Sequence, residues 1–170
     1  MSPSDRPVAL QLHLLRHADA GDPAAWTGDD ADRPLSPKGV AQSERLGEFL
    51  ASVGFRPDAI ISSPKLRARQ TADLVANALG ATVTVDDRLA EGVDPPTVDR
   101  MLEDFGTSRR PVLVGHDPDF SEILGYLAGT DALTMKKGAF ARLDVKGPVA
   151  GGQGTLRWLV PPDLLDRERR

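Results

Sequence analysis

Apolar residues recur with two different periods along this chain, and segments of the two kinds alternate. Six short runs have the apolar, β-branched character of strands, at residues 8–15, 59–62, 82–85, 111–114, 140–145 and 155–160. Each of the first four gaps between these runs carries apolar residues at helical spacing: Val40, Leu46, Leu50 and Val53; Ala68, Ala72, Val75 and Leu79; Val98, Met101, Leu102 and Phe105; Phe120, Ile123, Leu124 and Leu127. The alternation predicts a layered α/β fold.

Each of the four predicted helices is preceded by the same kind of dipeptide. A serine or aspartate stands directly before a proline at Ser36-Pro37, Ser63-Pro64, Asp94-Pro95 and Asp117-Pro118. The side-chain oxygen can accept a hydrogen bond from the first turn of a helix, where the missing N–H of proline costs nothing. These pairs predict where the helices begin.

The order of strands and helices has a consequence for function. Arg16 and His17 end the first strand, Arg67 falls in the first turn of the second helix, and His116 follows the fourth strand. Strand C-termini and the helix N-termini that follow them lie at one edge of such a sheet, and helix N-termini favour anions. We therefore expect these residues to converge on an anion site.

Length and composition restrict the remaining possibilities. The 170 residues suit a single domain, residues 1–170, with a core at about 8–160 and a C-terminal tail that we expect to fray. No apolar run reaches the roughly 18 residues of a membrane span. The chain has no cysteine, so it can form neither disulfides nor thiolate metal sites, and this is compatible with a cytoplasmic protein.

The charge of the chain bears on its partners and on two of its loops. The formal net charge of −4 does not favour nucleic acid as a ligand. Five aspartates fall between Asp19 and Asp32, and we interpret them as a solvated acidic loop. The segment 146–154 is rich in glycine and is predicted to be a loop between the last two strands.

Four motifs together resemble those of the histidine phosphatase superfamily, which has the phosphoglycerate-mutase-like fold. They are Leu14-Leu15-Arg16-His17-Ala18, the segment 32–39, the segment 63–72 and Val114-Gly115-His116-Asp117-Pro118. They occur in the order of the family, and the chain is most similar to its small SixA-type phosphohistidine phosphatases. The resemblance implies a three-layer sandwich with a mostly parallel central sheet flanked by helices.

The resemblance also assigns roles to individual residues. His17 would be the nucleophile that forms a covalent phosphohistidine, which water then hydrolyses. Arg16 and Arg67 would hold the phosphoryl oxygens, since the planar guanidinium donates to two oxygens together. His116 would complete the phosphate-binding set as a donor. Gly115 is expected to let the backbone turn tightly beside it.

The group that protonates the leaving group is not determined by the motifs: two carboxylates and water are the candidates. Glu91 follows Leu89 and Ala90, where larger family members carry a catalytic glutamate. Asp19, two residues after the nucleophile, is the rival. A phosphohistidine substrate needs such an acid less, because an imidazole leaving group can be protonated before it departs.

No metal and no cofactor are predicted. His13 and His17 are four residues apart, but in a strand this spacing corresponds to about 13 Å, too far for one metal ion. His13 is therefore interpreted as structural.

The leading hypothesis is an enzyme: a cofactor-independent, cytoplasmic phosphatase acting on phosphohistidine in a protein or on a small phosphomonoester. The alternatives are phosphoryl transfer on a small metabolite by a phosphomutase and a non-catalytic module that binds a phosphorylated ligand. The expected partner is the phosphorylated protein or small phosphoester, with no nucleic acid and no membrane; the oligomeric state stays undetermined.

Overall fold

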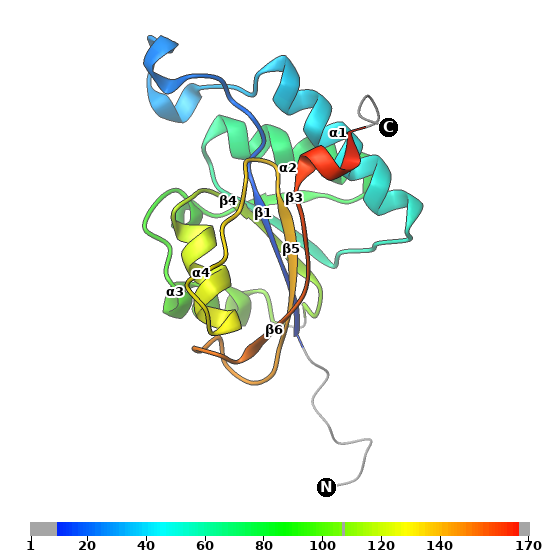
Figure 1. The fold of residues 1–170 in the computed structure, drawn as a ribbon, viewed down its shortest axis with the longest axis vertical. Helices are drawn as coiled ribbons and strands as arrows, with labels where there is room; N and C mark the ends of the chain where they lie inside the picture. Colours follow the sequence, from blue (N-terminus) through cyan, green and yellow to red (C-terminus); the bar gives the residue numbers. More distant parts are fainter. Residues whose placement is uncertain (1–9, 107, 167–170) are drawn as a thin grey trace, which may run out of the picture.

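Six strands form one mixed sheet at the centre of the protein, in the order β3-β2-β4-β1-β5-β6 (Figure 1). The computed structural model describes residues 10–106 and 108–166. The strands are β1 Leu10–Arg16, β2 Ala59–Ser62, β3 Val83–Val85, β4 Pro111–Gly115, β5 Phe140–Val145 and β6 Gly154–Val160. Strands β3, β2, β4 and β1 run parallel, whereas β5 and β6 are antiparallel to their neighbours.

The predicted strands are all present, with small differences at their ends. The second and fifth predicted runs match β2 and β5 to the residue, and the glycine-rich segment connects β5 to β6. The first strand continues one residue beyond its prediction, to Arg16. Its predicted first two residues, Val8 and Ala9, lie outside the described residues.

Helices cover both faces of the sheet and complete the three predicted layers. They are α1 Pro37–Ser52, α2 Leu66–Leu79, α3 Pro95–Asp104 and α4 Asp119–Ala128. On one face α1 and α2 pack with Leu15 of β1, and on the other α3 and α4 pack with Leu12 and Leu14. Figure 1 shows the two helix pairs on opposite sides of the strands. Alternate residues of β1 therefore enter different cores, as the pleat of a strand requires.

Two of the four predicted helix starts are confirmed, and two are wrong in detail. Ser36 accepts a hydrogen bond from Gly39 and caps α1, and Asp94 accepts one from Thr97 and caps α3. In contrast, α2 begins at Leu66 and α4 at Asp119, each without a side-chain bond from its cap residue.

In those two helices the predicted capping residues make other bonds. Ser63 accepts a bond from the N–H of Lys65, ahead of α2. Asp117 accepts bonds from both the N–H and the hydroxyl of Ser121, in the first turn of α4. The turns after β2 and β4 thus hold these side chains at the sheet edge, before the helices start.

The prediction of a frayed tail is wrong for residues up to 166, and the rest of the tail, residues 167–170, lies outside the described residues. Pro162–Leu165 forms a 3₁₀ helix, here called the C-terminal turn. Leu165 packs against the core beside α1 and α2, and Asp166 forms an ion pair with Arg45 of α1. Burial of Pro162 and the packing of Leu165 hold the segment in place.

The topology creates a crevice at one point of the sheet edge. After β1 the chain passes to α1 on one face, and after the neighbouring β4 it passes to α4 on the other. Ligands of open α/β sheets bind outside the carboxyl ends of strands at such a switch point. Among the described residues, no helix is long and apolar enough to cross a membrane.

Candidate active site

The pairing of β1 with β4 brings two of the predicted site residues together. Arg16 is opposite Gly115 in this parallel pair, so His17 and His116 both follow at the same level. The N–H of His17 donates to the carbonyl of Gly115 at 2.9 Å, which extends the pairing by one residue. The two imidazole rings lie 5.2 Å apart.

The backbone holds His17 in one tautomer. Its Nδ1 lies 2.7 Å from the carbonyl oxygen of Ala18, and because that oxygen can only accept, Nδ1 carries the hydrogen. The lone pair is therefore on Nε2, which has no hydrogen-bond partner among the described residues. Burial, together with the nearby charges of Arg67, Arg16 and Lys137, lowers the pKa of His17 to about 4. The ring is thus neutral near pH 7.

His116 is held through its other ring nitrogen. Its Nε2 lies 2.7 Å from the Ser63 hydroxyl, whose only other described side-chain contact is the donating N–H of Lys65. The hydroxyl hydrogen is free to go to Nε2, so we assign the imidazole hydrogen to Nδ1. Burial, the neighbouring His17 ring and the charges of Arg67 and Lys65 lower the pKa of His116 to about 3. His116 is then a neutral donor.

Both predicted arginines are anchored by carbonyl oxygens and carboxylates. Arg16 donates from Nη1 to the carbonyl of Met135 at 2.7 Å and lies 3.4 Å from Asp117. Arg67 donates from Nη1 to the carbonyl of Asp30 at 2.8 Å and from Nη2 to its carboxylate at 2.9 Å. Each guanidinium is thereby held in a set orientation.

Three buried nitrogens have no hydrogen-bond partner among the described residues: Nε of Arg16, Nε of Arg67 and Nδ1 of His116. They belong to the three residues that the sequence predicts as phosphate-binding. A buried donor without a partner costs about 1–3 kcal/mol. Their coincidence in one region marks a place that is suited to a ligand rich in acceptor oxygens.

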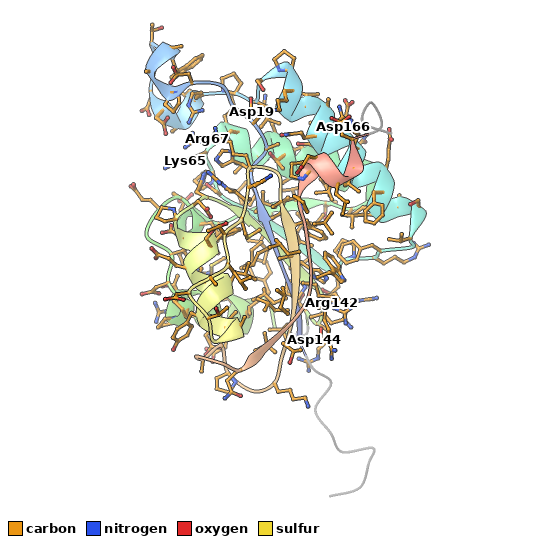
Figure 2. The ribbon with its side chains drawn as sticks, viewed as in Figure 1. Asp19, Lys65, Arg67, Arg142, Asp144 and Asp166 are labelled. Carbon is orange, nitrogen blue, oxygen red and sulfur yellow. The ribbon has the colours of Figure 1, made fainter. Side chains whose placement is uncertain are left out.

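One pocket of about 430 Å³, here called the phosphoryl pocket, contains all five predicted site residues. His17, Arg16, Arg67, His116 and Glu91 line it. Figure 2 shows Lys65 and Arg67 together at the start of α2, on the side of the molecule that also carries Asp19. The structure thus places residues from four separate segments of the chain around one space.

The two candidates for the acid differ in their surroundings. Glu91 is exposed at the rim of the phosphoryl pocket and makes no hydrogen bond or ion pair with another described residue. Asp19 lines a neighbouring cleft instead and accepts a bond from the Ser36 hydroxyl at 2.6 Å. This bond is the main reason that the pKa of Asp19 lies below its usual range. Asp19 therefore holds Ser36, the N-cap residue of α1, in place.

Residues 21–30 are exposed, as expected for a solvated acidic loop, but Asp30 also takes part in the site. Its carboxylate bridges Arg33 and Arg67, at 3.2 Å and 2.9 Å. Arg33, although buried, lines the phosphoryl pocket and also donates to the carbonyl of Ala20. Sequence reasoning missed both residues. The only signal was the place of Arg33 within the segment 32–39, because Asp30 does not stand out among its neighbouring aspartates.

Two lysines of the pocket were also missed. Lys65 and Lys137 line it, and both lower the pKa of a histidine there. Nothing in the local sequence marks Lys65 as a site residue, and nothing distinguishes Lys137 from Lys136. Only the fold places these charges beside His17 and His116.

The expectation that Gly115 permits a tight backbone turn is wrong. Its φ is not positive, so no unusual turn requires glycine. A Cβ at this position would lie 2.7 Å from the ring of Phe120. Glycine is needed here because the aromatic ring of α4 packs directly against the end of β4.

His13 lies apart from the site, on the face of the sheet covered by α1 and α2. Its ring is buried against Phe55, Phe140 and Trp158, and its Nδ1 lies 3.1 Å from the carbonyl of Pro111. Within the described ranges, no group of three or more histidine and carboxylate side chains could hold a metal ion.

Comparison with known proteins agrees with this geometry. A model of the histidine phosphatase superfamily (branch 1) matches residues 12–94. An uncharacterised protein of Picosynechococcus is 36% identical over 116 residues, which cover 66% of this chain and 70% of the relative. The chain belongs to the histidine phosphatase superfamily, branch 1.

Solved structures place the fold among small members of that superfamily. A protein of Agrobacterium tumefaciens assigned as the phosphohistidine phosphatase SixA is 28% identical, with a TM-score of 0.75 over 90% of this chain and 98% of that one. A SixA complexed with tungstate is 23% identical, with a TM-score of 0.80 over 92% and 100%.

Some curated relatives are longer proteins. Sequences assigned as the phosphoglycerate mutase GpmB of Salmonella arizonae and other Salmonella are 33% identical over 115 residues. The match covers 62% of this chain but only 51% of the relative, so this chain spans about half of the mutases that it matches.

Proposed function

We propose that the protein is a phosphatase that hydrolyses a phosphohistidine or phosphomonoester through a covalent intermediate on His17. One observation carries the proposal: a neutral His17, with its lone pair on Nε2, shares a pocket with the three residues whose buried donors lack partners. A phosphoryl group offers an electrophilic phosphorus atom to the lone pair of His17 and acceptor oxygens to the three donors.

In the first step, the lone pair of Nε2 attacks phosphorus as the bond from phosphorus to the leaving group breaks. The new phosphorus–nitrogen bond makes the ring cationic, while Nδ1–H stays bonded to the carbonyl of Ala18. Arg16, Arg67 and His116 donate to the phosphoryl oxygens through the transfer. Removing one preorganised donor of this kind typically costs roughly 3–4 kcal/mol in the transition state.

In the second step, water attacks the phosphorus and the phosphorus–nitrogen bond breaks. The electron pair returns to Nε2 of His17, the proton of water is lost to solvent or phosphate, and inorganic phosphate leaves. Lowering of the pKa of His17 by burial and by two arginines favours this return to the neutral ring.

The substrate that we favour is phosphohistidine presented by another protein. The segment that could roof the pocket, between Arg88 and the start of β4, instead sends Val98 and Met101 of α3 into the core. Of the described residues in this segment, only Ala90, Glu91 and Gly92 line the pocket. An unroofed pocket can admit a side chain that belongs to a macromolecule. The likeness to a SixA of 28% identity supports the same class.

The decisive experiment traps the intermediate. After brief exposure to a phosphohistidine peptide carrying radioactive phosphate, the protein should hold acid-labile, base-stable label in the peptide that contains His17. His17→Ala should hold none. Label on a serine, an aspartate or His13 would disprove the mechanism.

A matched pair of arginines provides the control for the phosphate-binding set. Arg67→Ala should lose more than about 100-fold in kcat/KM. Arg69→Ala, two residues along the same helix, removes an exposed arginine that pairs with Asp73 and should leave the rate within about twofold. Equal effects of the two substitutions would argue against a specific role for Arg67.

Phosphomutase activity is the second candidate, because the GpmB relatives share 33% identity with this chain. A mutase must keep water from its phosphohistidine and pass the group to an acceptor. Incubation with labelled phosphoglycerate distinguishes the two: inorganic phosphate is the product of the proposed phosphatase, and an isomeric phosphoglycerate is that of a mutase.

A further inference from the structure

A second cleft, of about 670 Å³, adjoins the phosphoryl pocket. Arg16 and Lys137 line both spaces, so the cleft lies directly beside the site that holds His17. Nothing in the proposed phosphoryl transfer uses this larger space. Its position suggests that it contacts the part of a substrate beyond the phosphoryl group.

Three elements that are distant in sequence build the cleft. Lys38, Gln42 and Arg45 are spaced four and three residues apart on α1, so they share one face of that helix. Lys136 and Lys137 come from the loop before β5, and Asp163 and Asp166 from the C-terminal turn and the residue after it. Figure 2 shows Asp19 and Asp166 on the side of the molecule along which α1 runs.

The charge of this cleft is opposite to that of the whole protein. Five basic side chains line it against three carboxylates, in a chain whose net charge is −4. A concentration of one sign of charge in a cleft favours ligands of the opposite sign. The excess of two positive charges therefore selects an anionic ligand.

The ion pairs already present in the cleft are long. Lys136 lies 3.8 Å from Asp163, Arg45 lies 3.8 Å from Asp166, and Lys137 lies 4.0 Å from Asp19. Charge-assisted hydrogen bonds are about 2.7–2.9 Å long, so these contacts are loose. Lys38 is exposed and forms no ion pair among the described residues. Basic groups held this weakly can turn to carboxylates of a ligand.

We propose that this cleft, here called the acidic-peptide cleft, binds aspartate and glutamate side chains next to the phosphorylated residue of a polypeptide substrate. The proposal rests on the phosphatase function above and specifies its substrate. With the phosphohistidine side chain in the phosphoryl pocket, the main chain would pass over Arg16 and Lys137. An extended chain advances about 3.3 Å per residue, so acidic residues within a few positions enter the cleft.

The test compares two phosphohistidine peptides that differ only in having aspartate and glutamate, or asparagine and glutamine, around the histidine. Wild-type protein should hydrolyse the acidic peptide with a kcat/KM at least about fivefold higher, mainly through a lower KM. The preference should shrink as salt rises from 0.05 to 0.5 M, since the Debye length falls from roughly 14 Å to 4 Å. A merely structural role would not produce this salt dependence.

Charge reversal in the cleft should remove the preference. Lys38 and Lys136 are exposed, and together Lys38→Glu and Lys136→Glu turn the positive excess of the cleft into a negative one. This double variant should prefer the neutral peptide. Arg100→Glu is the control, because Arg100 is exposed on α3, across the sheet from the cleft; its preference should equal that of the wild type.

Binding of the same peptides without the phosphoryl group, by fluorescence anisotropy, separates the two proposals. If wild type binds the acidic peptide more tightly than the double variant does, the proposed cleft is supported. If neither phosphopeptide is hydrolysed, the phosphatase function is refuted, and the binding result still stands. Equal hydrolysis and equal binding of both peptides by wild type would overturn the cleft and leave the phosphatase intact.

Discussion

The rings of His17 and His116 lie 5.2 Å apart because their strands pair in parallel with Arg16 opposite Gly115. Each ring uses one nitrogen to hold its place: Nδ1 of His17 bonds the carbonyl of Ala18, and Nε2 of His116 bonds the hydroxyl of Ser63. The remaining nitrogens have opposite characters, a lone pair on His17 and an N–H on His116. A nucleophile and a donor thus stand side by side in one pocket.

The first prediction concerns the pH dependence of activity. Because the pKa of His17 is lowered to about 4, its lone pair is available at all higher pH and is lost as pH falls through about 4. We expect the acid limb of kcat/KM near pH 4. An NMR titration of the His17 ring should give the same value without interference from ionisation of the substrate. A limb and a ring titration near 6.5, the reference pKa, would contradict this.

The second prediction concerns the pH dependence of stability. The pKa values of His13, His17 and His116 are all lowered, to about 4, 4 and 3, chiefly by burial. A histidine that the fold keeps neutral makes its full contribution to the free energy of unfolding above its unfolded-state pKa of about 6.5. That contribution falls as the pH drops towards the folded-state pKa. At pH 5 each histidine should have cost about 2 kcal/mol of unfolding free energy.

Urea unfolding at pH 7 and pH 5 measures this loss. Carboxylates with lowered pKa values contribute little in that range, because they titrate in the unfolded chain only near pH 4. His13→Gln should reduce the difference between the two pH values. Equal stability at pH 7 and pH 5 would show that the histidines are not buried as neutral rings.

The third prediction identifies the acid through the leaving group. Glu91→Gln should slow hydrolysis of an alkyl phosphate by about 10²–10⁴-fold, because an alkoxide leaves poorly without a proton. Phosphohistidine and an activated aryl phosphate should be affected far less. Asp19→Asn should leave all three rates within a few-fold, since Asp19 lines the neighbouring cleft. Equal losses on all three substrates for Glu91→Gln would make it a binding or structural residue.

The fourth prediction tests whether Asp30 orients the arginines. Asp30→Asn removes the negative charge between Arg33 and Arg67 and should lower kcat/KM about tenfold. Asp32→Asn is the matched control, because Asp32 is an exposed carboxylate of the same loop. A loss of equal size in both variants would indicate a general effect of charge, without any contribution from the orientation of Arg67.

The fifth prediction concerns Thr71, which ties α2 to the residue after His17. Its hydroxyl accepts the N–H of Ala18 at 3.1 Å and donates to the carbonyl of Arg67 at 2.7 Å. Thr71→Val keeps the shape but leaves the buried N–H of Ala18 without a partner, so unfolding free energy should fall by about 1–3 kcal/mol. Because Ala18 also holds the ring of His17, kcat should fall as well.

Two further variants separate these effects. Thr71→Ser should restore kcat. Ser43→Ala removes another buried hydroxyl, one that bonds the carbonyl of Gly39 within α1, and should lower stability alone. A Thr71→Val protein with normal kcat at a temperature where it is fully folded would show that Thr71 has no role in positioning His17.

Local chemistry in the sequence was sufficient for much of the fold and part of the site. Apolar periodicity predicted all six strands and four helices, because the pleat of a strand and the turn of a helix each demand their own spacing of buried residues. Ser36 and Asp94 marked helix starts correctly, since a cap bonds the chain only a few residues away. The resemblance of motifs then indicated His17, Arg16, Arg67, His116 and Glu91, which line one pocket.

Only the tertiary structure decided how those residues are held. Asp30 looked like any other aspartate of an acidic loop until the fold placed it between Arg33 and Arg67, 37 residues away from the latter. The tautomer of His17, the partner of His116 and the charge of the second cleft likewise depend on contacts between distant segments. Side-chain orientation and pKa arise from burial and from neighbours in space, and sequence spacing carries neither.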